Sequence, residues 1–351
     1  MVQRNGIYFN ALALTPGGSG VQTYSRNVIA GITRATDLSV VARVQNSAQS
    51  QLPERVIADV VGDCHGVRRV VQGLRPTRSG AALIHGLDVD LPITRSIPTV
   101  ATVHDLAVFD VPWAFSRFRA AGERALLKQN LRRADAIIAV SQFSADRLGH
   151  WLGLDATVTH LAPSPNTQPA TPTQVEAVRH RYRLPDEFVL HVGTVEPRKG
   201  IPALASLCER LDVPLVLAGA LQIDLPNAGT VRPLGYVPAD DLAPLYGAAT
   251  VVAYPSVYEG FGLPPIEALA CGAIVVTTKV GALPEILGAG GYPLAEPGDS
   301  NDLGNLLEAA LYDSEQRQGM TAAGARAISK LSWERNTAEV LEVYSGLGLQ
   351  V

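Results

Sequence analysis

The sequence predicts an α/β protein of two domains, each built around a doubly wound parallel sheet. Short apolar runs without polar alternation recur along the chain, and segments of helical pattern separate them. Such runs are typical of parallel strands that are covered on both faces. Residues 162–173 read APSPNTQPATPT and interrupt this pattern near the middle of the chain. A stretch of that composition is typical of a linker between domains.

The predicted strands fall into two groups, one on each side of the linker. The first group is Gly6–Phe9, Leu38–Val44, Ala81–His85, Pro98–His104 and Asp135–Ser141. The second group is Phe188–Gly193, Val213–Gly219, Thr250–Tyr254 and Ala273–Thr277. With helices between the strands, right-handed βαβ units follow. We expect domains over residues 1–165 and 166–331 that face each other, with a ligand in the cleft between them, beyond the carboxyl ends of the strands.

Composition excludes several classes of protein. The 351 residues are 47% hydrophobic and 18% charged, which excludes a disordered chain. A formal net charge of -4 argues against a dedicated nucleic-acid binder. The 3 cysteines form no CxxC pair and no zinc spacing, and neither a leader peptide nor an apolar run long enough for a membrane span is evident. These features favour a reduced, cytoplasmic setting.

Residues 251–288 contain a predicted strand, a glycine-bearing loop and the start of a helix. The helix begins near Pro264 or Pro265, because proline suits the first helical turn. A helix N-terminus has unsatisfied N–H donors and a partial positive charge, which suit a phosphate group. The residues that would offer it N–H groups or close backbone approach are Gly260, Phe261, Gly262 and Leu263.

Two carboxylates flank that helix start, Glu259 in the loop and Glu267 on the helix. Their pattern, within P-S-x-Y-E-G-F-G-L-P-x-x-E-A-L-A-C-G, resembles retaining glycosyltransferase family 4, whose GT-B fold has two Rossmann-like domains. The resemblance covers nearly the whole chain. It implies that Glu267 binds the ribose of a nucleotide and that Glu259 contacts hydroxyl groups of the donor sugar. It also implies that a last helix, within residues 332–351, packs back on the first domain.

Further segments resemble other parts of the family's donor site. In HVGTVEPRKG, Lys199 matches the lysine that grips the diphosphate, whose developing negative charge calls for cations. Many members carry an arginine directly after the glycine of this segment; Thr194 stands there, and Arg198 is the nearest substitute. The segment VRPLGYV resembles the part that contacts the base, and its candidates are Gly235, Tyr236 and Val237. The loop TPGGSGVQTY resembles the glycine loop that faces the phosphates, and its candidate is Gly20 or Gly18.

His104, in TVHDL at a predicted strand end, resembles the family histidine that approaches the donor sugar. The predicted catalytic residues are therefore Glu259, His104, Lys199 and Arg198. Asp88 and Asp90 form a D-x-D pattern, which holds a divalent metal in another glycosyltransferase fold. Here it lies far in sequence from the Glu259 loop, and the helix end and basic residues serve the diphosphate. We therefore predict no metal and no cofactor.

The resemblance implies a retaining transfer of a hexosyl group from a nucleotide-diphosphate sugar to an acceptor hydroxyl on a glycan, a lipid-linked molecule or a small molecule. GDP-mannose is the first donor to consider, because G-T-x-E-P-R-K resembles bacterial polysaccharide mannosyl- and rhamnosyl-transferases. UDP- and dTDP-sugars, a sugar-nucleotide epimerase and a non-catalytic sugar-nucleotide-binding protein remain alternatives. A dinucleotide oxidoreductase is excluded, since Gly18 and Gly20 lead to Thr23 rather than to the third glycine of its fingerprint.

A basic helix is predicted over Arg117–Arg133, where Arg117, Arg124, Lys128 and Arg132 recur at helical spacing. Trp113, Phe115 and Phe118 lie just before it or at its start. Such a helix can rest on an anionic membrane or meet a lipid-diphosphate acceptor. The alternative is an ordinary solvated face. We expect an enzyme of the cytoplasm, with this helix as a candidate for contact with the inner face of the cell membrane.

Overall fold

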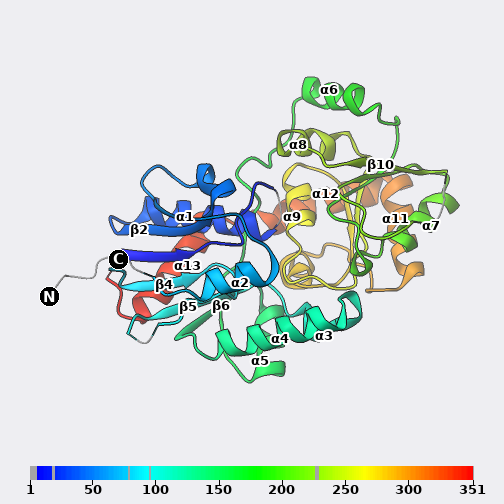
Figure 1. Ribbon diagram of the computed structural model, residues 1–351. Coiled ribbons are helices and arrows are strands. Elements are labelled where there is room, and N and C mark those ends of the chain that lie inside the picture. The colour runs from blue at the N-terminus through cyan, green and yellow to red at the C-terminus, as the bar shows by residue number, and fades with distance from the viewer. Residues whose placement is uncertain (1–5, 18–19, 78–79, 95, 226–228, 351) are drawn as a thin grey trace. The chain divides into compact units, whose positions relative to one another are not determined.

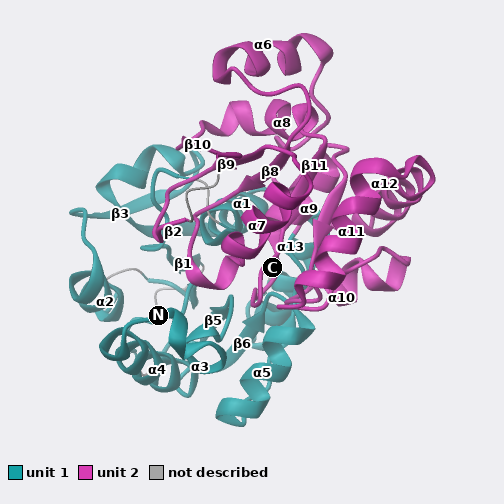
Figure 2. Ribbon diagram, turned by 90° about the vertical axis from the view of Figure 1, so that its right-hand side faces the viewer, with its two compact units in different colours: residues 1–161, 332–351 teal, residues 162–331 magenta. Residues whose placement is uncertain are grey.

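The chain forms two compact units in a computed structural model that describes residues 6–17, 20–77, 80–94, 96–225 and 229–350. Unit 1 comprises residues 1–161 and 332–351, and unit 2 comprises residues 162–331 (Figure 2). Unit 2 thus begins at Ala162, inside the stretch predicted as a linker. Each unit has a parallel sheet, and helices connect most of the consecutive strands (Figure 1). The predicted fold class of two doubly wound α/β units is therefore confirmed.

The sheet of unit 1 has the strand order β3-β2-β1-β4-β5-β6-β7. The order reverses at β1, which pairs with β2 on one side and β4 on the other. Its strands are β1 (Gly6–Asn10), β2 (Ser39–Gln45), β3 (Ile57–Val61), β4 (Leu83–Gly86), β5 (Thr99–Val103), β6 (Ala136–Ala139) and β7 (Thr157–Val158). Its helices are α1 (Gly20–Ala35), α2 (Gly66–Leu74), α3 (Ala107–Asp110), α4 (Arg117–Leu131), α5 (Gln142–Leu152) and α13 (Trp333–Gly346).

The sheet of unit 2 has the strand order β10-β9-β8-β11-β12, and its order reverses at β8. Its strands are β8 (Val189–Val192), β9 (Leu215–Ala218), β10 (Val231–Gly235), β11 (Val251–Tyr254) and β12 (Val275–Thr277). Its helices are α6 (Pro172–Tyr182), α7 (Ile201–Arg210), α8 (Ala239–Ala248), α9 (Leu263–Ala270), α10 (Leu283–Ile286), α11 (Ser300–Tyr312) and α12 (Ser314–Ile328).

Burial explains why the apolar runs identify the strands. Strands β1, β4, β5, β9 and β11 are buried at every position, so neither face of them can carry exposed polar residues. The strands β3, β7 and β10, which the sequence analysis does not predict, lie at sheet edges. There, side chains such as Ile57 and Val60 are exposed, and no continuous apolar run is required.

No helix among the described residues is long and apolar enough to cross a membrane. The three cysteines, Cys64, Cys208 and Cys271, are free thiols and are buried.

Helix α13 completes unit 1 by packing on α1 and on the sheet. A Cβ atom at Gly31 of α1 would lie 2.1 Å from Thr337 Oγ1, so the absence of a side chain at Gly31 lets the two helices approach closely. Asn336 Nδ2 donates to His160 O at 2.9 Å. These contacts join residues that are far apart in the sequence into one core.

A chain of buried polar groups also ties α13 to the sheet. The Tyr344 hydroxyl lies 2.6 Å from His85 Nδ1, and His85 Nε2 lies 2.8 Å from Thr102 Oγ1. The Tyr24 hydroxyl lies 2.9 Å from the same Thr102 oxygen. Burial, with a smaller effect of nearby His104, lowers the pKa of His85 to about 3, so this imidazole stays neutral. The network satisfies polar groups that water cannot reach.

Replacing Tyr344 with phenylalanine is expected to destabilise unit 1 by about 1–3 kcal/mol, because His85 Nδ1 would stay buried without a partner. Urea unfolding measures the loss of stability, and hydrogen exchange of the amides in β4 and β5 shows that the loss falls on unit 1. Tyr312→Phe is the matched control, since the Tyr312 side chain is exposed. Equal stability of both variants would contradict this role of the network.

Candidate active site

The candidate site of unit 2 lies where the strand order reverses, at the carboxyl ends of β8 and β11. The segment after β8 forms a single 3-10 turn, Pro197–Lys199, and packs against the segment after β11. Val257 N donates to Arg198 O at 2.9 Å. Gly200 has φ +66°, and a Cβ atom there would lie 2.2 Å from Pro255 O. Open α/β sheets bind ligands at this kind of crevice.

Glu259 contacts three other polar side chains of this site. Its Oε1 lies 2.5 Å from Lys199 Nζ and accepts a hydrogen bond from Ser256 Oγ at 2.7 Å. Its Oε2 lies 3.1 Å from Arg198 NH1. The same guanidinium nitrogen donates to Tyr258 O at 3.0 Å. The structure therefore brings together three of the four predicted catalytic residues.

The electrostatics of the site keep Glu259 ionised. Burial, the largest single effect, raises the pKa of its carboxyl group, but the charges of Lys199 and Arg198 together with hydrogen bonds outweigh burial. The hydrogen bonds come from Lys199 and Ser256, and the resulting pKa is about 2. The side chain of Glu259 is therefore a fixed negative charge at any physiological pH.

This ion cluster is expected to make the stability of unit 2 depend on acidity. The pKa of Glu259 falls from an ordinary 4.5 to about 2 on folding, so its ionised form stabilises the fold above pH 4.5 by about 3 kcal/mol. This contribution is lost as the pH falls from 4.5 toward 2. Urea unfolding across that window measures the loss. The Glu259→Gln variant should have a flatter profile there, and an unchanged profile would contradict the assignment.

The helix that follows β11 starts as predicted. Gly262 is its N-cap residue, in the left-handed conformation with φ +86°, and α9 begins at Leu263. Pro264 and Pro265 carry no amide hydrogen, so the donors at this end are confined to the N–H groups around them. Those of Phe261, Gly262 and Leu263 flank the prolines on one side, while the Phe261 and Leu263 side chains are buried.

Glu267 lies on α9, close to the buried hydroxyl groups of Tyr246 and Tyr254 and the buried thiol of Cys271. The hydroxyls of Tyr246 and Tyr254 are 3.2 Å apart. Burial, and then the charge of Glu267, raises the pKa of the Cys271 thiol to about 12. The same charge contributes to raising the pKa of both tyrosines. Glu267 therefore lies close enough to act electrostatically on all three groups.

The predicted base-contacting residues lie at the end of β10. Gly235 is the last residue of that strand and has φ +70°. The Tyr236 side chain is 76% exposed, whereas that of Val237 is buried. Of the three, Tyr236 alone therefore presents a side chain to solvent.

The remaining predicted site residues belong to unit 1. His104 Nε2 lies 2.9 Å from Leu87 O, so Nε2 donates its hydrogen to this carbonyl oxygen. The ring makes an edge contact with Tyr24 at 5.0 Å between centroids. Gly20 is the first residue of α1, and Gly18 lies outside the described residues.

The two aspartates of the D-x-D pattern share one arginine. Arg69 NH1 lies 3.3 Å from Asp88 Oδ2 and 3.0 Å from Asp90 Oδ2. Among the described residues, no group of three or more histidine, cysteine or acidic side chains is arranged to hold a metal ion. The pattern therefore contributes an ion pair between α2 and the segment after β4.

Two residues of the candidate site have no role in the sequence analysis. Glu196 Oε1 lies 2.7 Å from Arg198 NH2, and Ser256 donates to Glu259. Both belong to segments that the family resemblance covers, but nothing in their spacing alone indicates these contacts. A third segment supports Ser256, because Thr278 Oγ1 donates to Ser256 O at 2.5 Å.

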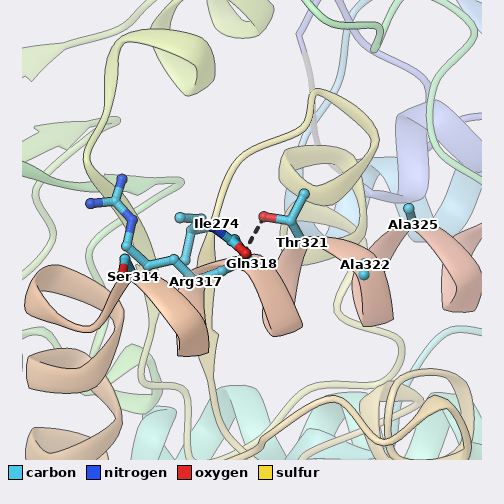
Figure 3. Close-up of a pocket in the computed structure, with 7 residues that line it drawn as sticks. All are labelled: Ile274, Ser314, Arg317, Gln318, Thr321, Ala322 and Ala325. Atoms are coloured by element: carbon cyan, nitrogen blue, oxygen red, sulfur yellow. Dashed lines mark hydrogen bonds between the residues drawn. The ribbon is translucent and has the colours of Figure 1, made fainter.

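A shallow pocket of about 560 Å³ lies elsewhere in unit 2, along α12 (Figure 3). Thr321 Oγ1, at its edge, donates to Arg317 O within the same helix at 2.9 Å. This pocket contains none of the predicted site residues. The residues that line it are Ile274, Ser314, Arg317, Gln318, Thr321, Ala322 and Ala325.

The fold and this site together define the GT-B class of glycosyltransferases. The model of the family described as Glycosyltransferase Family 4 matches residues 18–165, and that of Glycosyl transferases group 1 matches residues 175–327. O-antigen chain mannosyltransferase B of Escherichia coli is 34% identical over 298 residues, which cover 77% of this chain and 78% of that protein. The chain belongs to glycosyltransferase family 4 and is a glycosyltransferase.

Solved structures share the fold. Sucrose-phosphate synthase from Thermosynechococcus elongatus has a TM-score of 0.77 at 20% identity, over 98% of this chain and 99% of that chain. Anabaena Alr3699/HepE in complex with UDP-glucose has a TM-score of 0.75 at 20% identity, over 98% of this chain and 100% of that chain. Both alignments extend over both units.

Proposed function

We propose that this enzyme transfers a hexosyl group from a nucleoside-diphosphate sugar to an acceptor hydroxyl, with retention of configuration. The observation that carries the proposal is the cluster of Glu259, Lys199 and Arg198 at the strand-order reversal of unit 2. The leaving group is a diphosphate that gains negative charge, and cations placed at a crevice stabilise such charge. A protein of the same fold whose structure is solved in complex with UDP-glucose supports a nucleotide sugar as donor.

Each part of the donor has a proposed partner. Lys199, Arg198 and the N–H groups of residues 261–263 hold the diphosphate. Glu267 accepts hydrogen bonds from the ribose, and residues 235–237 contact the base, with Tyr236 as the exposed ring. In this scheme protein cations neutralise the diphosphate, so the transfer needs no metal ion and no cofactor.

Retention is proposed to follow a front-face route. The bond from the anomeric carbon to the diphosphate breaks, and the acceptor oxygen bonds to the same face of that carbon. The leaving phosphate oxygen takes the proton of the acceptor hydroxyl. Glu259 is held by two cations as a fixed anion, an arrangement that suits stabilising positive charge on the sugar better than attacking the anomeric carbon as a covalent nucleophile.

The acceptor is proposed to bind to unit 1. His104, which also belongs to unit 1, is proposed to approach the donor sugar, where its Nδ1 atom would accept a hydrogen bond from a hydroxyl group. GDP-mannose is the proposed donor, supported by the 34% identity to O-antigen chain mannosyltransferase B. A glycan, free or carried on a lipid-linked intermediate, is the acceptor class that fits such a relative, and we propose the glycan chain itself.

A panel of nucleotide sugars tests the proposal. GDP-mannose, UDP-glucose and a dTDP-sugar are scored for thermal stabilisation, for slow hydrolysis and for transfer. NMR of the transferred sugar gives its anomeric configuration. We expect stabilisation and retention. If no nucleotide sugar of the panel stabilises the protein, the proposal fails. Formation of a new nucleotide sugar without transfer would identify an epimerase instead.

We also propose that α4 rests on an anionic membrane surface. Phe118 is 93% exposed and Trp113 is 61% exposed. Arg117, Lys128 and Arg132 are exposed on the same helix or just after it. Arg124, predicted to share this face, instead donates from Nε to Val108 O at 2.6 Å. An apolar side chain beside exposed cations suits the boundary between headgroups and acyl chains.

Sedimentation with vesicles tests this contact. Vesicles that contain phosphatidylglycerol should bind the protein, and pure phosphatidylcholine vesicles should not. Phe118→Ser should weaken the binding, whereas Leu221→Ser, at an exposed position of unit 2, should leave it unchanged. Equal binding to both kinds of vesicle would contradict recognition of an anionic surface, and binding to neither would leave α4 as an ordinary solvated face.

A further inference from the structure

The candidate site of unit 2 contains four charged side chains that are joined in a row by ion pairs. Glu196 pairs with Arg198 at 2.7 Å, Arg198 pairs with Glu259 at 3.1 Å, and Glu259 pairs with Lys199 at 2.5 Å. Two cations thus face two anions, and the formal charge of the set is zero. Its side chains are only 12–26% exposed, so solvent screens these charges weakly.

Glu196 contacts one nitrogen of the Arg198 guanidinium, and different groups contact the other. Arg198 NH2 lies against Glu196, and Arg198 NH1 contacts both Glu259 and the Tyr258 carbonyl oxygen. The backbone of the turn is fixed separately, because Val257 N donates to Arg198 O. The side chain at position 196 can therefore change its charge without removing the other supports of Arg198.

We propose that Glu196 sets how tightly the site holds a nucleoside diphosphate, by cancelling the charge of Arg198. This inference rests on the proposed function, in which Arg198 and Lys199 hold the diphosphate. Without Glu196, two cations would face the ligand against Glu259 alone. Donor and product would then both bind more tightly, and binding that is equally strong before and after transfer does not accelerate the chemical step. Glu196 thereby favours release of the nucleoside diphosphate product.

Glu196→Gln isolates this effect, because the amide oxygen can still accept a hydrogen bond from Arg198 while the charge is lost. We expect the Kd for GDP to fall about tenfold, as for one unit charge at a partly buried site. The inhibition constant of GDP as a product should fall by the same factor. Binding of guanosine, which carries no phosphate, should not change. Added salt should weaken GDP binding more steeply in the variant than in the wild type.

Two further variants complete the test. Glu196→Asp keeps the charge and should bind GDP within about twofold of the wild type. Glu176→Gln removes an exposed carboxylate on α6 of the same unit and should change nothing. The inference is overturned if Glu196→Gln binds GDP no more tightly than the wild type. It is also overturned if the glutamine and aspartate variants both bind GDP more weakly, which would mean a structural role alone.

The failure of the proposed function gives a different result. If the wild-type protein binds neither GDP nor UDP, the diphosphate site itself is absent. If the wild type binds GDP and the charge at position 196 has no effect, only the role of Glu196 is wrong.

Discussion

The Glu259→Gln variant is expected to lose transfer activity by about a hundred- to a thousandfold while keeping its fold. The amide has the shape of the carboxylate and can still accept hydrogen bonds from Lys199 and Ser256. It cannot supply the negative charge that would stabilise a positively charged sugar in the transition state. The rate of transfer from the donor found in the nucleotide-sugar panel measures the loss.

Binding of GDP to the Glu259→Gln variant separates catalysis from affinity. The variant should bind GDP at least as tightly as the wild type, because the carboxylate no longer competes for the two cations. Glu259→Ala should lose as much activity. Full transfer activity in either variant would remove Glu259 from the mechanism.

Replacing Lys199 with methionine is expected to weaken GDP binding by about ten- to a hundredfold, the usual effect of losing a hydrogen bond to a charged group. The side chain of Lys199 is only 12% exposed, so water cannot readily take its place as a hydrogen-bond donor to the diphosphate. The pKa of Glu259 should rise at the same time, because the cation that lowers it most is gone. Calorimetric titration with GDP gives the Kd.

Lys330→Met is the matched control for that variant. Lys330 is exposed and lies just beyond α12, so its removal should leave GDP binding unchanged. Guanosine binding should be the same in the wild type and in both variants. Unchanged GDP affinity in Lys199→Met would place the diphosphate elsewhere.

The central strands can be predicted from sequence because burial on both faces leaves a continuous apolar run. In β4 the run Leu83–Gly86 has no exposed position. The edge strands β3, β7 and β10 are not predicted, for a physical reason, whereas the edge strand β12 is buried throughout and is predicted. Asp59 of β3 and Pro233 of β10 interrupt any apolar run, and one side of each strand needs no partner. The fold class follows from the central strands alone.

The candidate site divides in the same manner. Glu259, Lys199 and Arg198 lie in segments whose residue order resembles a family, and the structure shows them in contact. Glu196 and Ser256 become visible only when the segments after β8 and β11 are packed together. Their contacts depend on side-chain directions across two loops, which residue spacing does not determine.

The return of α13 to unit 1 has a consequence for synthesis on the ribosome. Unit 2 is one continuous stretch, residues 162–331, whereas unit 1 needs residues 332–351 as well. Until those residues emerge, the His85 imidazole lacks the Tyr344 hydroxyl, and the α1 surface around Gly31 lacks its cover. Unit 2, although made later than most of unit 1, can therefore reach its native state first. A chain cut short before Trp333 should expose apolar surface on unit 1 and leave unit 2 intact.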